Sequence, residues 1–475
     1  YPYLKKDLDT GRVTQERAFE LLEHFFLSFN KDSDLYPGVQ QGDNGQSMVL
    51  GGLTFEGSEG FNLLSEMCLE ASRELKLIDP KINLRVNKTT PLSIYEKGTL
   101  LTREGLGFPQ YSNDDIVIPG LVNMGYRLKD AQNYTVAACW EFIVPGYGMD
   151  IPNIGALSFP GIVNKAIHEN LSVAESFEAF FSCVEDGIRS ECEKIVAGTS
   201  HLWMAPAPFL SLLMDGCIAR RQDISMGSRY NNYGIHGTGL STAVDSLTAI
   251  KKLVFEEKSV RADEMLLAVK TDFAGQDNLL HRVRYELPKL GDGSGGPPVL
   301  AGKLLHAFSE AVGNLENERG GRIRAGTGSA MYYLWHAAKI SSSVDGRREG
   351  EPFAANYSPS LFARIPGPIS VIQDFTTPDL SKTINGGPLT LEFHSSMFRT
   401  KDSIRKVAHL IQYFIARGGH QLQLNAVDRA QLLDAQIHPE NYPQLIVRIW
   451  GWSAYFIELD REYQEHVLRR QEYGA

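Results

Sequence analysis

Residues Leu389-Thr390-Leu391-Glu392-Phe393 alternate apolar and polar side chains, which is typical of a β-strand. The chain then continues with patterns for a helix, a strand, a helix and a strand, over 403–416, 420–427, 429–437 and 444–450. This β-α-β-α-β alternation predicts parallel strand pairing, because a parallel connection needs a crossover segment between its strands. The stretch ends in a tight turn at Gly451, and it places the protein in the α/β class.

Upstream of this stretch, apolar residues at helical spacing predict helices over 60–76, 172–197 and 241–257. Residues 134–144 are mostly apolar and predict one buried strand. The run Gly234-Ile235-His236-Gly237-Thr238-Gly239 lacks the spacing of a phosphate-binding loop and follows no clear strand. We therefore interpret this run as a glycine-rich structural loop and His236 as an ordinary packed or surface histidine.

The composition excludes several classes of protein. The 475 residues carry a net charge of −10, whereas nucleic-acid and anionic-membrane binders usually carry a basic excess. No apolar run approaches the ~20 residues of a membrane-spanning helix. The five cysteines form no CxxC pair and no zinc-type spacing with histidine, so we expect no disulfide framework, no bound metal and a reducing cytoplasm.

Cys139 lies in the apolar segment Ala137-Ala138-Cys139-Trp140-Glu141-Phe142, with an ionisable residue two positions further on. In an extended strand, Cys139 and Glu141 would point to the same face. A buried carboxylate costs several kcal/mol unless it is paired, so such a group usually has a task. The pair predicts a site for hydrogen-atom or proton transfer, although Cys139 taken alone is more typical of a packed core cysteine.

Gly451 stands between two tryptophans, Trp450 and Trp452, directly after a predicted strand. A turn glycine with positive φ is the ordinary interpretation. Two large aromatic side chains would, however, shield this turn from water, which a plain surface turn does not need. Gly451 is therefore a second candidate site residue.

The segment Val447-Arg448-Ile449-Trp450-Gly451-Trp452, followed by Leu459, Gln464, Val467 and Arg470, resembles the signature of the glycyl radical enzymes. Cys139-Trp140-Glu141 resembles the Cys-x-Glu motif that many members carry far upstream of this signature. Further blocks of the chain resemble the family as well, so that the resemblance covers essentially its whole length. They are 43–52, 230–240, 345–352 and 419–425.

The resemblance implies a chemical role for each of these residues. A backbone radical at Gly451 would be stored between turnovers, because glycine has no Cβ to crowd a planar radical centre. Cys139 would form a thiyl radical that takes hydrogen from the substrate and returns it to the product. Glu141 would act as the acid or base that moves the substrate's proton. The aromatic residues Trp140, Phe142, Trp450 and Trp452 would exclude water and oxygen.

Within the family, Glu141 disfavours the succinate synthases and the pyruvate formate-lyases. The aromatic context of Cys139 resembles the arylacetate decarboxylases, such as 4-hydroxyphenylacetate decarboxylase, and predicts cleavage of a C–C bond. Two alternatives stay open. One is an eliminase that acts as a diol or glycerol dehydratase, a choline trimethylamine-lyase or an isethionate sulfite-lyase. The other is an inactive fragment that serves a full-length enzyme as a radical-domain partner.

The resemblance also implies an architecture and partners. We expect the C-terminal portion of a ten-stranded α/β barrel with helices packed around it. Residues 1–345 would carry the cysteine loop and residues 346–475 would form the glycine radical domain. Family subunits are longer, so the start at Tyr1 predicts a truncated product. We expect no bound cofactor, a radical installed by a radical-SAM activating enzyme with S-adenosylmethionine and a 4Fe-4S cluster, a homodimer, a small iron–sulfur subunit, and the cytoplasm of an anaerobic bacterium.

Overall fold

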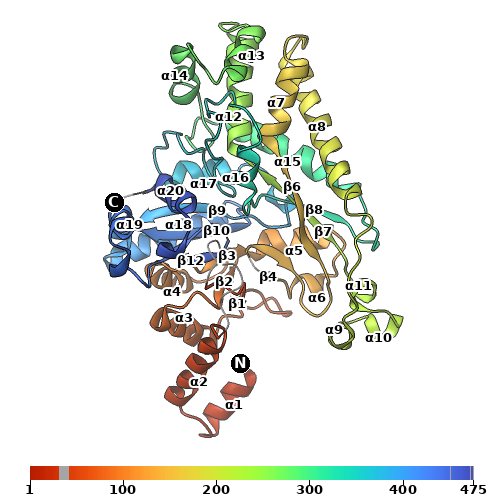
Figure 1. Ribbon diagram of the computed structural model, residues 1–475. Helices are drawn as coiled ribbons and strands as arrows, with labels where there is room; N and C mark the ends of the chain where they lie inside the picture. The colour runs from red at the N-terminus through yellow and green to blue at the C-terminus, as the bar shows by residue number, and fades with distance from the viewer. Residues whose placement is uncertain (32–41, 138, 450, 471, 474–475) are drawn as a thin grey trace. The chain divides into compact units, whose positions relative to one another are not determined.

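The computed structural model describes residues 1–31, 42–137, 139–449, 451–470 and 472–473 (Figure 1). The chain divides into two compact units, each assembled from segments distant in sequence. The first unit comprises Tyr1–Val117, Thr135–Trp140 and Thr390–Ala475, and the second comprises Ile118–Tyr134 and Glu141–Leu389. The chain therefore passes from the first unit to the second between Trp140 and Glu141.

The first unit contains a six-stranded sheet in the order β1-β2-β3-β10-β9-β13. Its strands are β1 (Ser47–Gly51), β2 (Lys81–Val86), β3 (Gln110–Asn113), β10 (Gln421–Val427), β9 (Leu389–His394) and β13 (Glu472–Tyr473). Strands β1, β2 and β3 run parallel, β10 is antiparallel to β3, and β13 is parallel to β9. Since β3 and β10 pair directly, segments some 300 residues apart meet at the centre of this sheet.

The helices of the first unit begin at recognisable caps. Asn62 and Ser65 form a reciprocal capping box at the start of α3, and Thr400 and Ser403 do the same for α18. Phe26 of α2 packs with residues of α3, α4 and β2 in one apolar core. The helices are α1 (Pro2–Asp9), α2 (Gln15–Ser28), α3 (Leu63–Leu75), α4 (Leu92–Thr102), α18 (Lys401–Ala416), α19 (Arg429–Ile437) and α20 (Arg461–Arg469), with short η3 (Ser395–Phe398), η4 (Pro439–Asn441) and η5 (Phe456–Glu458).

The second unit is built around a parallel sheet in the order β6-β7-β8. These strands are β6 (Ile151–Ser158), β7 (Tyr233–Thr238) and β8 (Ile323–Gly326). In the register of the sheet, His236 of β7 lies between Ala156 of β6 and Gly326 of β8. Every residue of β7 and β8 is buried, whereas most residues of the edge strand β6 are only partly buried.

Along the chain, helices precede and follow each strand of this sheet. Helix α12 is buried along its whole length and continues into the π-helical turn η1. The helices are α6 (Leu128–Ala131), α7 (Phe159–Asn170), α8 (Phe177–Ala197), α9 (Pro208–Leu213), α10 (Cys217–Arg220), α11 (Ile224–Gly227), α12 (Leu240–Ile250), η1 (Lys251–Glu256), α13 (Ala262–Lys270), α14 (Asp277–Tyr285), α15 (Pro297–Gly313), α16 (Tyr332–Ala337), α17 (Pro368–Phe375) and η2 (Leu380–Lys382). Helix α5 (Asp114–Asn123) runs across the boundary between the units. No helix of the described residues has both the length and the apolar character of a membrane span.

Two strand predictions were wrong. Residues 134–144 do not form one strand, because a turn at Cys139 and Trp140 separates β4 (Thr135–Ala137) from β5 (Glu141–Ile143). The alternation argument that placed Cys139 and Glu141 on one face therefore does not apply. Conversely, residues 234–239 are not a loop, since five of them belong to strand β7.

The predicted parallel alternation of the C-terminal region does not extend to its third strand. The first two strands, β9 and β10, are neighbours in the six-stranded sheet. The third, β11 (Ile446–Arg448), instead pairs antiparallel with β12 (Ser453–Tyr455) in a separate two-stranded sheet. The chain folds back at the Gly451 turn, and this hairpin prevents β11 from continuing the alternation.

Candidate functional site

Gly451 lies at the tip of the hairpin formed by β11 and β12. Arg448 pairs with Ser453 across the hairpin, and the Ile449 amide donates to the Trp452 carbonyl at 2.9 Å. Gly451 is buried and has φ of +127°, a conformation that residues with a side chain rarely adopt. The predicted shielding residue Trp450 lies outside the described residues.

The turn at Gly451 packs directly against the cysteine loop. A Cβ atom built on Gly451 would lie 2.5 Å from Cys139 Cβ and 2.3 Å from Cζ3 of the Trp140 ring. Real Cβ atoms do not approach other atoms so closely, so only glycine fits here with this backbone. The structure thus brings together two of the three predicted site residues. Trp140 is fully buried and forms part of the wall around Gly451, as the sequence predicted.

Three linked glutamines, two of which bond to the backbone of the cysteine loop, lie beside it; we call them the glutamine ladder: Gln110 of β3 and Gln421 and Gln423 of β10. Gln110 Nε2 donates to the Cys139 carbonyl at 3.1 Å and to Gln423 Oε1 at 2.9 Å. Gln421 Nε2 donates to the Trp140 carbonyl at 3.1 Å and to Gln110 Oε1 at 3.2 Å. Because all three side chains are buried, losing one partner would leave unsatisfied polar groups.

Arg470, which follows helix α20, holds the strand side of the glycine turn. Its guanidinium donates to the Arg448 carbonyl at 2.7 Å and to the Ile449 carbonyl. It also forms an ion pair of 2.9 Å with Glu392 of β9, whose side chain accepts from Asn425 of β10 at 2.8 Å. Arg470 therefore connects the glycine turn to the central sheet of the first unit.

An ion cluster holds the other side of the turn. Asp43 accepts from the Ser453 amide at 2.8 Å and pairs with Lys81, which also lies 3.5 Å from Asp79. Burial alone would raise the pKa of Asp43, but the Lys81 ammonium, the Ser453 amide and the Arg448 charge together outweigh burial and lower that pKa. Burial and the charge of Asp43 raise the pKa of Asp79, although Lys81 opposes them. The ionised form of Asp43 is thus favoured, and it is a strong acceptor for Ser453.

Arg448 is the cationic side chain nearest the cysteine loop in this network. Its Nε donates to Gln423 of the glutamine ladder at 3.3 Å and its Nη1 to Ser453 Oγ at 3.3 Å. Burial lowers the pKa of Arg448, while the charge of Asp43 favours its protonated form. A Cβ on Gly107 would lie 2.2 Å from Arg448 Cβ, so a glycine at 107 is required for Arg448 to reach this position.

Replacing Arg470 with glutamine is expected to loosen the glycine turn. The variant loses charge-assisted bonds to two carbonyls and leaves Glu392 buried without its cation. The free energy of opening the turn should therefore fall by about 3 kcal/mol. Hydrogen–deuterium exchange of residues 446–456 should therefore accelerate by about 10²-fold, the factor that corresponds to this free energy. The exposed neighbour Arg469 offers the control Arg469→Gln, for which no acceleration is expected. Equal exchange in both variants would contradict this role.

Glu141, the third predicted residue, belongs to the second unit. Its side chain is 6% exposed, and its Oε1 lies 3.6 Å from Nε2 of the buried His236. The next residue, Phe142, is buried and accepts a hydrogen bond at its carbonyl from Arg324 at 2.7 Å. Glu141 is therefore a buried carboxyl beside a histidine, and the interpretation of His236 as an ordinary histidine missed that neighbour.

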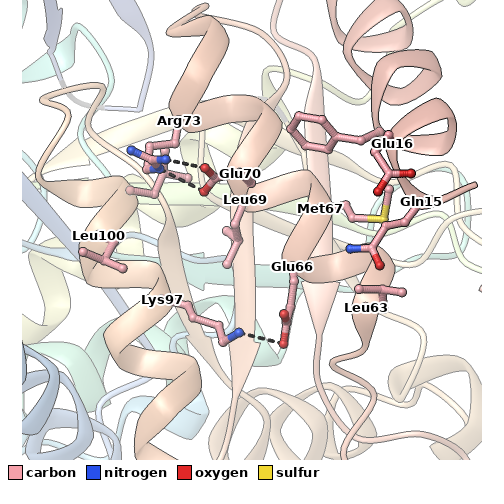
Figure 2. A pocket seen from close by; sticks show the side chains of 12 residues that line it. Gln15, Glu16, Leu63, Glu66, Met67, Leu69, Glu70, Arg73, Lys97 and Leu100 are labelled. Carbon is pink, nitrogen blue, oxygen red and sulfur yellow. Dashed lines mark hydrogen bonds and ion pairs between the residues drawn. The ribbon is translucent and has the colours of Figure 1, made fainter.

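A surface cavity of about 510 Å³ in the first unit lies apart from these residues (Figure 2). It is bordered by α2, α3 and α4, and four of its charged side chains form two ion pairs. Arg73 contacts Glu70, and Lys97 lies 2.7 Å from Glu66. None of Cys139, Glu141 and Gly451 lines it. Within the described ranges, no group of three metal-ligating side chains could hold a metal ion.

Comparison with protein families gives two matches. The family described as pyruvate formate lyase-like matches residues 1–335, and the family described as glycine radical matches residues 353–457. The chain therefore belongs to the pyruvate formate lyase-like family of glycyl radical enzymes. The domain boundary predicted between residues 345 and 346 stays a prediction.

Curated relatives include enzymes of different specificity. Trans-4-hydroxy-L-proline dehydratase of Clostridioides difficile is 28% identical over 99% of this chain and 63% of its own length. (2S)-3-sulfopropanediol dehydratase of Klebsiella oxytoca is 26% identical over 99% of this chain and 61% of its own length. The 4-hydroxyphenylacetate decarboxylase glycyl radical subunit of Clostridioides difficile is 23% identical over the whole chain and 60% of its own length. The chain thus spans about 60% of the length of these relatives.

Solved structures show the same fold. A structure of B12-independent glycerol dehydratase from Clostridium butyricum matches with a TM-score of 0.92 and 28% identity, over 98% of this chain and 62% of that chain. A structure that concerns 1,2-propanediol dehydration in Roseburia inulinivorans matches with a TM-score of 0.94 and 28% identity, over 99% of this chain and 63% of that chain. The predicted fold class, the α/β barrel type of the glycyl radical enzymes, is confirmed.

Proposed function

We propose that this chain carries the radical pair of a glycyl radical lyase, with Gly451 as the stored radical and Cys139 as the thiyl. The observation that carries the proposal is the packing of Gly451 against Cys139 in the first unit. Hydrogen-atom transfer requires contact, and the buried turn between Trp140 and Trp452 keeps water from the radical position. The family match over residues 353–457 supports Gly451 as the modified residue.

The proposed cycle conserves atoms and electrons. Cys139 gives its thiol hydrogen atom to the Gly451 radical, and the resulting thiyl takes a hydrogen atom from a substrate C–H bond. For a hydroxylated substrate, Glu141 accepts the proton of the retained hydroxyl and passes it to the neighbouring hydroxyl, which leaves as water. The product radical then takes a hydrogen atom from Cys139, which recovers its own from Gly451. The substrate becomes a carbonyl product and one water molecule, and no external oxidant is consumed.

Elimination of water from a small hydroxylated substrate is the first candidate reaction. The two dehydratase relatives are 26–28% identical to the chain, compared with 23% for the decarboxylase. Decarboxylation of an arylacetate such as 4-hydroxyphenylacetate, favoured by the sequence, is the second candidate. It rests on the aromatic residues Trp140 and Phe142, which flank Glu141 and are both fully buried.

The activated chain tests both candidates directly. The radical would be installed under anaerobic conditions by a radical-SAM activating enzyme, which carries a 4Fe-4S cluster and uses S-adenosylmethionine. Vicinal diols, hydroxyproline and 4-hydroxyphenylacetate would then be offered separately. An aldehyde, ketone or imine product supports elimination, whereas carbon dioxide and a methylarene support decarboxylation. A radical-bearing chain that yields neither from these substrates would overturn both assignments.

Replacing Glu141 with glutamine is expected to lower kcat by about 10²–10⁴-fold, the usual contribution of a general acid or base. The amide preserves the size of the side chain but cannot accept the substrate's proton. The yield of Gly451 radical should stay at the wild-type level, because Glu141 takes no part in radical storage. A control is Glu318→Gln, in the same unit, which alters a different partner, Tyr233. Turnover that survives in Glu141→Gln would contradict the proposed role.

The partners of the chain are part of the same proposal. A homodimer and a small iron–sulfur subunit are expected from the resemblance, the latter in the decarboxylase branch only. Analytical ultracentrifugation of the purified chain would test for the homodimer. Iron content after co-expression would test for binding of the small iron–sulfur subunit. The alternative of an inactive radical-domain partner predicts radical formation without turnover of any substrate.

A further inference from the structure

A buried cluster in the second unit surrounds the Glu141 carboxyl. His236, at the centre of β7, is 0% exposed, and its Nε2 lies 3.6 Å from Glu141 Oε1. The Nδ2 atom of Asn385 lies 3.4 Å from the same His236 nitrogen and donates to the Pro152 carbonyl at 2.7 Å. One ring nitrogen of the imidazole, Nε2, therefore lies near both a carboxyl and an amide.

Two glycines make room for this cluster. A Cβ on Gly326 of β8 would lie 2.6 Å from His236 Nδ1. A Cβ on Gly234 of β7 would lie 2.2 Å from Asn385 Oδ1. Both side chains thus occupy space that any other residue at positions 234 and 326 would fill. The backbone of the sheet is shaped around His236 and Asn385, which a merely surface or packing histidine does not require.

The other charged groups along this face of the sheet have their own partners. Arg324 of β8 lies 3.6 Å from Asp150, and Asp150 also accepts from Tyr126 at 2.5 Å. His336 lies 2.8 Å from Thr238 Oγ1 at the end of β7, and burial lowers its pKa to about 4, so it is neutral near pH 7. Of these groups, His236 is the one that lies 3.6 Å from the Glu141 carboxyl.

We propose that His236, oriented by Asn385, is a positioning residue that sets the orientation and protonation of the Glu141 carboxyl; this inference rests on the proposed function of Glu141. A proton on Nε2 points toward a Glu141 carboxylate. A ring whose proton lies on Nδ1 instead presents its Nε2 lone pair, which favours a protonated Glu141. The Nε2 proton therefore orients Glu141 as a carboxylate, which is the form that can accept a proton from the substrate.

A double-mutant cycle on the activated full chain tests whether His236 acts through Glu141. We expect His236→Leu to lower kcat by about 10²-fold or more, with the wild-type yield of Gly451 radical by EPR. His236→Gln, whose amide can still donate to the carboxylate, should recover activity to within about tenfold of wild type. On the Glu141→Gln background, His236→Leu should cause no further loss, because the two residues act as a unit. A full additional loss on that background would overturn the inference.

A second measurement does not depend on turnover. The chain has twelve histidines, few enough for ¹⁵N NMR of histidine-labelled protein. The His236 signal is assigned by its loss in His236→Gln, and we expect Glu141→Gln to shift it toward the other protonation or tautomeric state. The His336 signal, assigned through His336→Gln, serves as the control and should not move. An unmoved His236 signal would overturn the inference, even if the wild-type chain were to form no product and the proposed function failed.

Discussion

Gly451→Ala is expected to abolish the radical signal of the activated chain completely. The new Cβ would lie 2.3 Å from the Trp140 ring and 2.5 Å from Cys139, at a φ of +127° that alanine rarely adopts. The turn would therefore have to leave its position, and a side chain would crowd the planar radical centre. Anaerobic EPR after incubation with an activating enzyme and S-adenosylmethionine measures the effect, since the wild-type glycyl radical should give a doublet.

Gly418→Ala is a matched control in the same unit. Gly418 also has a positive φ, +88°, but a Cβ there would meet only Ile116, at 3.8 Å. This variant should lose about 1 kcal/mol of stability and keep the doublet. A doublet of wild-type intensity in Gly451→Ala would exclude Gly451 as the radical site. A doublet lost in both variants would assign the loss to backbone strain and contradict the argument from contact with Cys139.

Cys139→Ser is expected to uncouple radical storage from turnover. The hydroxyl occupies the place of the thiol, but it does not give up its hydrogen atom to a glycyl radical. The doublet at Gly451 should therefore persist, while product formation falls below about 10⁻³ of wild type, a barrier increase of about 4 kcal/mol or more. EPR intensity and product yield are measured on the same activated sample.

Cys183→Ser, a half-buried cysteine on α8, is the matched control for loss of a thiol. It should change neither the radical yield nor the product yield. If Cys139→Ser retained turnover, the hydrogen atom of the substrate would have to pass through another group. The proposed route through Cys139 would then be wrong.

Helices were the elements most accurately predicted from the sequence. The apolar stripe of Leu64, Cys68, Ala71 and Leu75 predicted a helix over 60–76, and α3 spans Leu63–Leu75. Similarly, α8 spans Phe177–Ala197 where a helix was predicted over 172–197. These elements depend on local periodicity and on caps such as Asn62 and Ser176, so a short window of sequence contains the necessary information.

The strands were harder to predict because their context is distant. The apolar residues 134–144 give no sign of the turn at Cys139, which depends on hydrogen bonds from Gln110 and Gln421 to its carbonyls. In β7, Gly234 and Gly237 interrupt the apolar pattern and conceal a strand whose neighbours are β6 and β8. Tertiary contacts, rather than local propensity, decide these segments.

The candidate site could be predicted only in part, because its residues also meet through contacts between distant segments. The signature around Gly451 and the Cys-x-Glu motif identified two separate segments, and the structure places Gly451 against Cys139. The glutamine ladder was missed, although one signal was present. Gln421, Gln423 and Asn425 alternate with leucines, which gives a buried strand one polar face. The partner His236 had no such signal, because nothing near it in sequence indicates that it meets Glu141.

The support of the glycine turn has a consequence for how the protein is made. Asp43 and Ser453 are 410 residues apart in sequence, and Gln110 and Gln423 are 313 apart. The contacts that hold the glycine turn and the cysteine loop therefore have very high sequence separation. At ribosomal rates of about 5–20 residues per second, synthesis of the roughly 300 residues between Cys139 and Gly451 takes about 15–60 s. The thiol therefore exists on the nascent chain well before the glycine that will pack against it. An oxidant present during translation would meet that thiol unprotected, whatever the stability of the finished fold.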